Sequence, residues 1–174
     1  MRRNERGFAL VELIVAATIM ALLVPALSTG ILLMVQDAQR GRNHITALRQ
    51  VQNAGHWVSH DAAMARTVST TDDPETPELE FITLAWTDWE SGDVHEVIYT
   101  LDDMPDDLKK LLRRHVVHDV DGIELENTTT LIATNVTGAS AFSQQDGVWR
   151  LLVEARSGRQ TEARQYEVNL RVNT

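Results

Sequence analysis

The sequence contains no cysteine, only 5% aromatic residues and few positive charges. Without cysteine the chain has no disulfide, no thiolate zinc site and no cysteine nucleophile. Sixteen Lys and Arg residues stand against 25 Asp and Glu, a net charge of −9, so we expect no nucleic-acid partner. The P-loop, G-x-S-x-G, G-x-G-x-x-G and H-E-x-x-H patterns are missing as well, and we expect neither an enzyme nor a bound cofactor.

One long apolar run, residues 8–35, follows a short basic N-terminus and carries a single ionisable side chain, Glu12. As a helix it would extend about 42 Å at about 1.5 Å per residue, more than the roughly 30 Å hydrocarbon core of a membrane. The run is too long for a secretory signal peptide and lacks an A-x-A site. We expect a single-pass membrane protein with its N-terminus in the cytoplasm and its remaining chain outside.

The segment Arg6-Gly7-Phe8-Ala9-Leu10-Val11-Glu12-Leu13 closely resembles the class III signal of type IV prepilins and pseudopilins. The resemblance implies that residues 1–7 are a leader, cleaved after Gly7 by a prepilin peptidase, and that Phe8 is then N-methylated. The apolar helix is kept. The partners implied are the peptidase, other minor and major pilins or pseudopilins, and an inner-membrane assembly platform.

Glu12 and Pro25 are the two unusual residues inside the apolar run. A carboxylate costs about 2.5–3.5 kcal/mol at a membrane-helix centre and less near its end. Cleavage would expose a cationic α-amino group, and Glu12 of the same or an adjacent subunit can pair with it during assembly. The alternative is a glutamate that reaches water at the membrane edge. Pro25 removes a backbone donor and should kink or loosen the helix, or it is simply tolerated there.

Helical periodicity continues through residues 36–66, where small apolar residues fall on one arc. These residues are Ala47, Leu48, Val51, Ala54, Val58, Ala62 and Ala65. We therefore expect one helix over residues 8–66, with an amphipathic second half that packs on a globular head at 67–174. The fold class predicted is α+β and pilin-like, a long N-terminal helix on an antiparallel sheet.

The period changes to two in the head, after a proline-rich loop at 69–78. Residues 79–86 and 94–101 predict a hairpin, and 148–156 and 162–172 predict two late strands. Short strands are expected at 123–125 and 131–133. Residues 108–118 are ambiguous, with a helical turn at their start and a strand at their end. This order resembles the J-type minor pseudopilins of type II secretion and related minor pilins. The features that carry this likeness are Asp61, the hairpin at 79–103, the segment Leu-Lys-Lys-Leu-Leu-Arg-Arg at 108–114, and Ala141-Phe142 before Val148-Trp149-Arg150-Leu151.

Few side chains suggest a metal. Asp119, Asp121 and Glu124 weakly resemble a calcium loop, although the following ligands and the flanking helices of an EF-hand are missing. His56 with His60, and His115 with His118, lack a third ligand. The sequence favours a structural subunit of a type II secretion or type IV pilus-like filament, acting in initiation or at the tip. The alternative is a signal-anchored extracytoplasmic binding domain that joins no filament.

Overall fold

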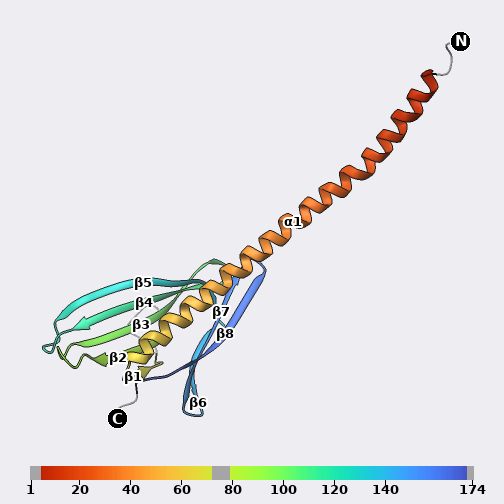
Figure 1. Ribbon diagram of the computed structural model, residues 1–174. Helices are drawn as coiled ribbons and strands as arrows, with labels where there is room; N and C mark the ends of the chain where they lie inside the picture. Colours follow the sequence, from red (N-terminus) through yellow and green to blue (C-terminus); the bar gives the residue numbers. More distant parts are fainter. Residues whose placement is uncertain (1–4, 72–78, 172–174) are drawn as a thin grey trace. The chain divides into compact units, whose positions relative to one another are not determined.

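The computed structural model describes residues 5–71 and 79–171, and the chain divides into two units, residues 1–42 and 43–174. One long helix, α1 (Glu5–Met64), is followed by eight strands and one short 3-10 turn in the described part of the chain (Figure 1). This order confirms the α+β, pilin-like arrangement. The strands are β1 (Thr67–Ser69), β2 (Leu79–Thr87), β3 (Val94–Asp103), β4 (Leu108–His118), β5 (Glu124–Thr137), β6 (Ala141–Gln145), β7 (Val148–Ser157) and β8 (Gln160–Val168), with a 3-10 turn, η1 (Pro105–Asp107), before β4.

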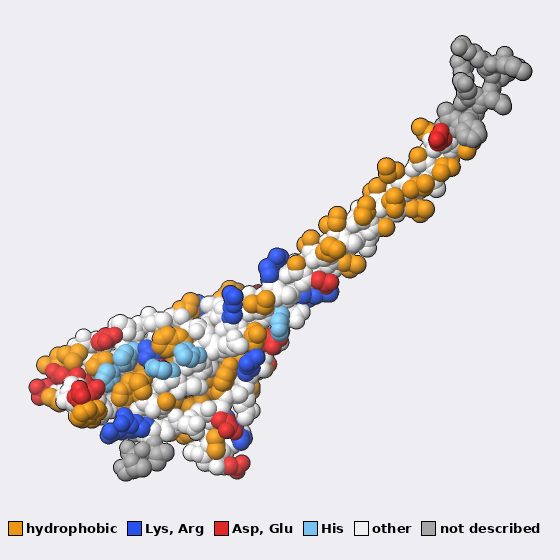
Figure 2. All heavy atoms as spheres, viewed as in Figure 1, with side chains coloured by type: hydrophobic (Ala, Val, Ile, Leu, Met, Phe, Trp, Pro, Cys, Tyr) orange, Lys and Arg blue, Asp and Glu red, His pale blue; other side chains and the backbone are white. Residues whose placement is uncertain are grey.

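The first unit contains the apolar part of α1, whose large hydrophobic side chains are exposed from Leu10 to Val35 (Figure 2). Its mean hydropathy reaches 2.4 over a membrane-length window, so this helix is long and apolar enough to cross a membrane. The hydroxyls of Ser28 and Thr29 donate to the carbonyls of Val24 and Pro25, at 2.8 and 2.9 Å. Together with the bond from the Thr18 hydroxyl to the Ile14 carbonyl at 2.6 Å, these bonds satisfy the hydroxyl groups of the described apolar run within the helix itself.

The second unit is an antiparallel sheet with the strand order β1-β2-β3-β4-β5-β7-β6, to which β8 adds by pairing with β7. Strands β2 to β5 form one broad layer, and β6 to β8 diverge from it (Figure 1). Only Val136 of β5 pairs with β7, at Ala155. Asn135 has a positive φ of 59°, and the pairing of β5 with β4 shifts between Lys109 and Leu111. Beyond this irregularity Val136 and Thr137 still pair with Lys109 and Leu108 of β4, and Val136 also pairs with Ala155 of β7, so the end of β5 joins the two parts of the sheet.

The last part of α1 packs on this sheet through the predicted stripe of small residues. Fully buried side chains recur along it, namely Ala47, Val51, Ala54, Val58 and Ala62, and Ala65 just after its end is buried as well. They meet strand residues such as Leu84, Val97, Leu111 and Leu151 in one core. Small residues on the helix let its backbone approach the sheet closely. At Gly55 an added Cβ would overlap the ring of Tyr166.

Several predicted boundaries are wrong. α1 ends at Met64 rather than residue 66, because the Arg66 amide already donates to the Ala85 carbonyl of β2. Residues 108–118 form strand β4 throughout, without a helical turn. The two short strands expected at 123–125 and 131–133 are one strand, β5.

At the C-terminus, β8 ends at Val168, short of the expected residue 172, which lies outside the described residues. Most of the loop expected at 69–78 also lies outside them, as do leader residues 1–4. The two-residue turn Asp146-Gly147 joins β6 to β7, a hairpin that the sequence analysis did not identify, although Asp-Gly is among its strongest signals.

Candidate functional site: processing segment and helix–sheet junction

The residues of the signal lie in the first turns of α1. Gly7 and Phe8 are helical, and Glu12 follows on an exposed face of the same helix. Among the residues that the structure describes, none forms an ion pair or hydrogen bond with Glu12. Its carboxylate is therefore free to meet a positive charge from outside this part of the chain.

A buried ion pair joins the amphipathic part of α1 to the sheet. Asp61 is fully buried, and the Arg113 guanidinium of β4 donates to it at 2.6 and 3.1 Å. The Tyr99 hydroxyl of β3 donates to the same carboxylate at 2.6 Å. Arg113 also lies over the Trp57 ring, 5.2 Å from its centroid. The carboxylate thus takes hydrogen bonds from Arg113 and Tyr99, with His60 Nδ1 a further 3.5 Å contact, and these offset the cost of burying it.

The pKa values around Asp61 follow from this contact. Burial favours the neutral guanidinium of Arg113, but its hydrogen bonds to Asp61 and the charge of that carboxylate prevail, and the pKa of Arg113 is raised. Burial and the Asp61 carboxylate together raise the pKa of Tyr99. Tyr99 therefore stays a hydrogen-bond donor, and Arg113 stays charged at neutral pH.

A stack of aromatic rings lies beside this ion pair. Trp86 and His95 are parallel at 5.1 Å between centroids, and His95 and His115 follow at 5.4 Å. The His95 Nδ1 and His115 Nε2 atoms are 3.1 Å apart. Burial lowers the pKa of His115, and the positive charge of Arg113 lowers it further. The lowered pKa keeps His115 neutral at neutral pH, so its ring packs in the stack without a charge.

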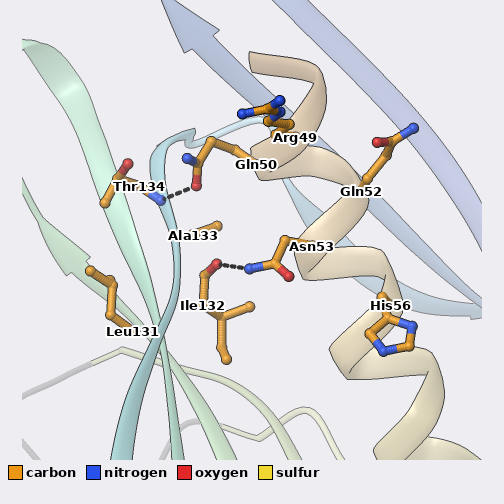
Figure 3. A pocket seen from close by; sticks show the side chains of 9 residues that line it. All are labelled: Arg49, Gln50, Gln52, Asn53, His56, Leu131, Ile132, Ala133 and Thr134. Carbon is orange, nitrogen blue, oxygen red and sulfur yellow. Dashed lines mark hydrogen bonds between the residues drawn. The ribbon is translucent and has the colours of Figure 1, made fainter. Parts of the chain in front are cut away.

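A groove separates α1 from the edge of β5 (Figure 3). It has a volume of about 590 Å³ and is lined by Arg49, Gln50, Gln52, Asn53 and His56 of α1 and by residues 131–134 of β5. Two helix amides reach across it. Asn53 Nδ2 donates to the Ile132 carbonyl at 2.6 Å, and Gln50 Oε1 accepts from the Thr134 amide at 2.8 Å. The Ile132 carbonyl and the Thr134 amide face α1 rather than a neighbouring strand. The side chains of Asn53 and Gln50 therefore supply their hydrogen-bond partners.

The structure does not join the weak metal candidates into a site. The Asp119 carboxylate accepts the amides of Asp121 and Ile123 at 2.9 and 2.8 Å, so it closes the β4–β5 turn. His115 contacts His95 rather than His118. His56 and His60 have ring centroids 6.3 Å apart. Over residues 5–71 and 79–171, no three His, Asp or Glu side chains gather as metal ligands.

The sequence analysis noted Asp61, and Arg113 within the segment 108–114, without giving either a role, and it did not identify Tyr99. The sequence did contain one indication of this buried contact. Asp61 interrupts the apolar arc between Val58 and Ala62, and a carboxylate in such a position needs a buried partner. Which strand supplies that partner depends on the sheet register, where Tyr99 pairs with Arg113 across β3 and β4.

Comparison with protein families matches residues 2–24 to the "Prokaryotic N-terminal methylation motif". Comparisons with curated proteins and with solved structures give no match. The matched range contains the cleavage junction, Glu12 and much of the apolar run. It supports a type IV pilin-like precursor, with N-terminal methylation after cleavage by a prepilin peptidase and single-pass anchoring by α1.

Proposed function

We propose that the chain is a minor pilin or pseudopilin, a structural subunit of a type II secretion or type IV pilus-like filament. The observation that carries the proposal is the methylation motif at residues 2–24, continuous with a helix apolar enough to span a membrane. An antiparallel head attached to that helix supports the same assignment. The subunit has no catalytic role.

Within this proposal the chain has four parts. Residues 1–7 are the leader and 8–35 the membrane half of α1, with Pro25 as the point where that half bends or loosens. Residues 36–66 are the amphipathic half, and 67–174 the head. The N-terminus lies in the cytoplasm and the head outside the inner membrane. After cleavage the subunit passes to the assembly platform and joins neighbouring pilins or pseudopilins.

Glu12 has the assembly role in this account. Methylation leaves the new α-amino group of Phe8 cationic, and an apolar filament core needs a carboxylate against it. The exposed Glu12, without a partner among the described residues, supports that role. A buried pair of this kind favours one axial register between subunits, as polar residues do in coiled coils.

The finer assignment is a J-type minor pseudopilin or a related minor pilin, acting in initiation or at the filament tip. Its support is the likeness of the late-helix carboxylate Asp61, the hairpin at 79–103 and the late strands. In this chain Asp61 anchors α1 to β3 and β4, which gives that likeness a physical role.

The decisive experiment is the intact mass of the protein, isolated from membranes with and without an active prepilin peptidase. We expect loss of residues 1–7 and one added methyl group only when the peptidase is active. Gly7→Leu is the matched control and should stay uncleaved, because a bulky residue occupies the junction. Recovery of the full chain beside active peptidase would overturn the proposal and favour a signal-anchored binding domain.

A further inference from the structure

The first half of β5 is an open strand edge. Residues 124–131 pair with β4 on one side, and all eight are exposed. On the other side, the only pair of β5 with another described strand is Val136 with Ala155. In an antiparallel ladder alternate residues direct both main-chain groups away from their partner strand. Every second residue of this segment therefore offers an N–H and a C=O to the outside.

The same strand shows how such groups are satisfied elsewhere. At Ile132 and Thr134, just beyond the open segment, the amides of Asn53 and Gln50 supply the missing bonds (Figure 3). No side chain in the described part of the chain does this for the main chain of residues 124–131. The groove along α1 continues that edge at Leu131. The unsatisfied stretch thus begins where the helix stops covering β5.

The other sheet edges are protected in ways that this one is not. β1 has three residues and β6 five, too short to pair extensively. The outer strand β8 is held against α1, because Tyr166 donates to the Val51 carbonyl and Glu162 contacts His44. The open segment carries no proline and no lysine, the residues that usually block edge pairing. Three consecutive threonines, Thr128 to Thr130, suit an extended strand.

The charged side chains of the turn before β5 and of the open segment itself are all acidic, whereas β4 places Arg113 and Arg114 opposite Thr130 and Thr129. Asp119, Asp121, Glu124 and Glu126 lie in the turn before β5 and at its start, and residues 119–131 contain no Lys or Arg. Acidic side chains also gather at this end of the sheet in Figure 2. Exposed Leu125 and Leu131 add apolar surface. Such an edge is complementary to a segment in which Lys or Arg alternates with apolar or hydroxyl residues.

We infer that residues 124–131 of β5 accept an extended, basic segment of another protein as an additional β-strand. Main-chain hydrogen bonds to the open edge provide the affinity, and Glu124 and Glu126 select for basic residues. A second copy of β5 is disfavoured as the occupant, because the segment contains no basic residue to face these glutamates. The site is on the head and is independent of N-terminal processing.

The test uses the full chain in detergent micelles and a synthetic peptide in which Lys alternates with Val and Thr. We expect the peptide to bind and to slow amide hydrogen exchange within residues 124–131. Two control peptides separate the contribution of main-chain hydrogen bonds from that of side-chain charge. One has N-methyl groups on alternate amides and cannot pair as a strand. The other carries Glu in place of Lys. Neither control should bind measurably.

Two double variants of the protein test whether the negative charge that favours peptide binding is the charge of Glu124 and Glu126. The E124Q/E126Q double variant should weaken binding about four- to tenfold, the effect of two cross-strand charge pairs. The D146N/E167Q variant removes the same charge from exposed positions elsewhere on the head and should bind as the original chain does. Equal binding of the N-methylated peptide, protection outside residues 124–131, or no binding by the lysine peptide would each overturn the inference.

Discussion

Asp61 and Arg113 form a buried ion pair across 52 positions of sequence, with 2.6 Å between Oδ2 and Nε. Their side chains are 1% and 11% exposed. Since one lies on α1 and the other on β4, the pair fixes the helix against the middle of the sheet at one rotation and one height. The Tyr99 hydroxyl shares the carboxylate. This junction is the most constrained polar contact that we find between helix and sheet.

Asp61→Asn should strongly destabilise the protein, because it leaves the Arg113 charge buried without its counterion. Loss of one partner of a buried pair costs about 3–5 kcal/mol. Tyr99→Phe removes one hydrogen bond to the carboxylate and should cost less, about 1.5 kcal/mol. Urea unfolding of the full chain in detergent measures both.

Asp103→Asn is the matched control for this comparison. Asp103 pairs with Lys109 at 2.6 Å, but its side chain is 89% exposed, so its loss should change stability very little. Equal effects of the variants at Asp61 and Asp103 would contradict the structural importance of the buried junction.

Gly55→Ala should destabilise the protein, although alanine normally favours a helix over glycine by about 1 kcal/mol. The new Cβ would overlap the Tyr166 ring, which must then leave its place against α1. Gly41→Ala in the same helix meets nothing within 4 Å and should be neutral or stabilising. In thermal unfolding we expect Gly55→Ala to lower the midpoint temperature and Gly41→Ala to leave it unchanged or raise it. A stabilised Gly55→Ala variant would show that α1 does not approach β8 this closely.

His115 should make the head less stable as the pH falls below about 6.5, the ordinary histidine pKa. Its folded-state pKa is lowered, first by burial and then by Arg113 and His95. The unfolded chain therefore takes up the proton first, and the free energy of unfolding falls until the pH passes the folded pKa. Urea unfolding at about pH 7.5 and pH 5 should show a smaller pH dependence in His115→Gln. His56→Gln leaves the ring stack intact, so this variant should show the same pH dependence of stability as the original chain.

The helix and the overall layout were predictable because their signals are local and repetitive. The apolar run, the arc from Ala47 to Ala65, and the alternation in β2 and β3 each reflect burial of one face. Strand β4 was harder to predict from the sequence. Its start, Leu108 to Leu112, has helical spacing, yet pairing with β3 on one side and β5 on the other fixes it as a strand. Tertiary pairing overrode local preference there.

The candidate sites divide in the same way. The processing segment is a contiguous motif, so the sequence alone is enough to predict Gly7, Phe8 and Glu12 as processing and assembly residues, and the family match spans these positions. The Asp61 junction and the open edge of β5 could not be predicted in this way. The Asp61 junction depends on the pairing of β3 with β4, and the open edge depends on where β7 diverges from β5. No spacing within the sequence encodes that divergence.

Glu12→Ala tests the assembly role of the proposed function. Membrane insertion should be unchanged or improved, since a costly charge is removed from the apolar helix. Incorporation into filaments should fall, because a neighbouring methylated N-terminus loses its counterion. Quantitative immunoblotting of sheared filaments and of total membranes measures the fraction of the subunit that is incorporated. Glu5→Ala, inside the cleaved leader, is the control. Normal incorporation of Glu12→Ala would favour a glutamate that simply reaches water.

A fragment comprising residues 36–174 should fold without a membrane. All of the buried hydrophobic residues that we identify lie at Ala47 or later, so the truncation removes exposed apolar surface and no core. It also removes three basic and two acidic residues, which leaves an acidic chain that resists association. Far-UV circular dichroism should show one cooperative urea transition, unaffected by reducing agent because the chain contains no cysteine. Introducing Asp61→Asn should shift that transition to lower urea. A fragment that aggregates without detergent would show that the apolar part of α1 contributes to the fold of the head.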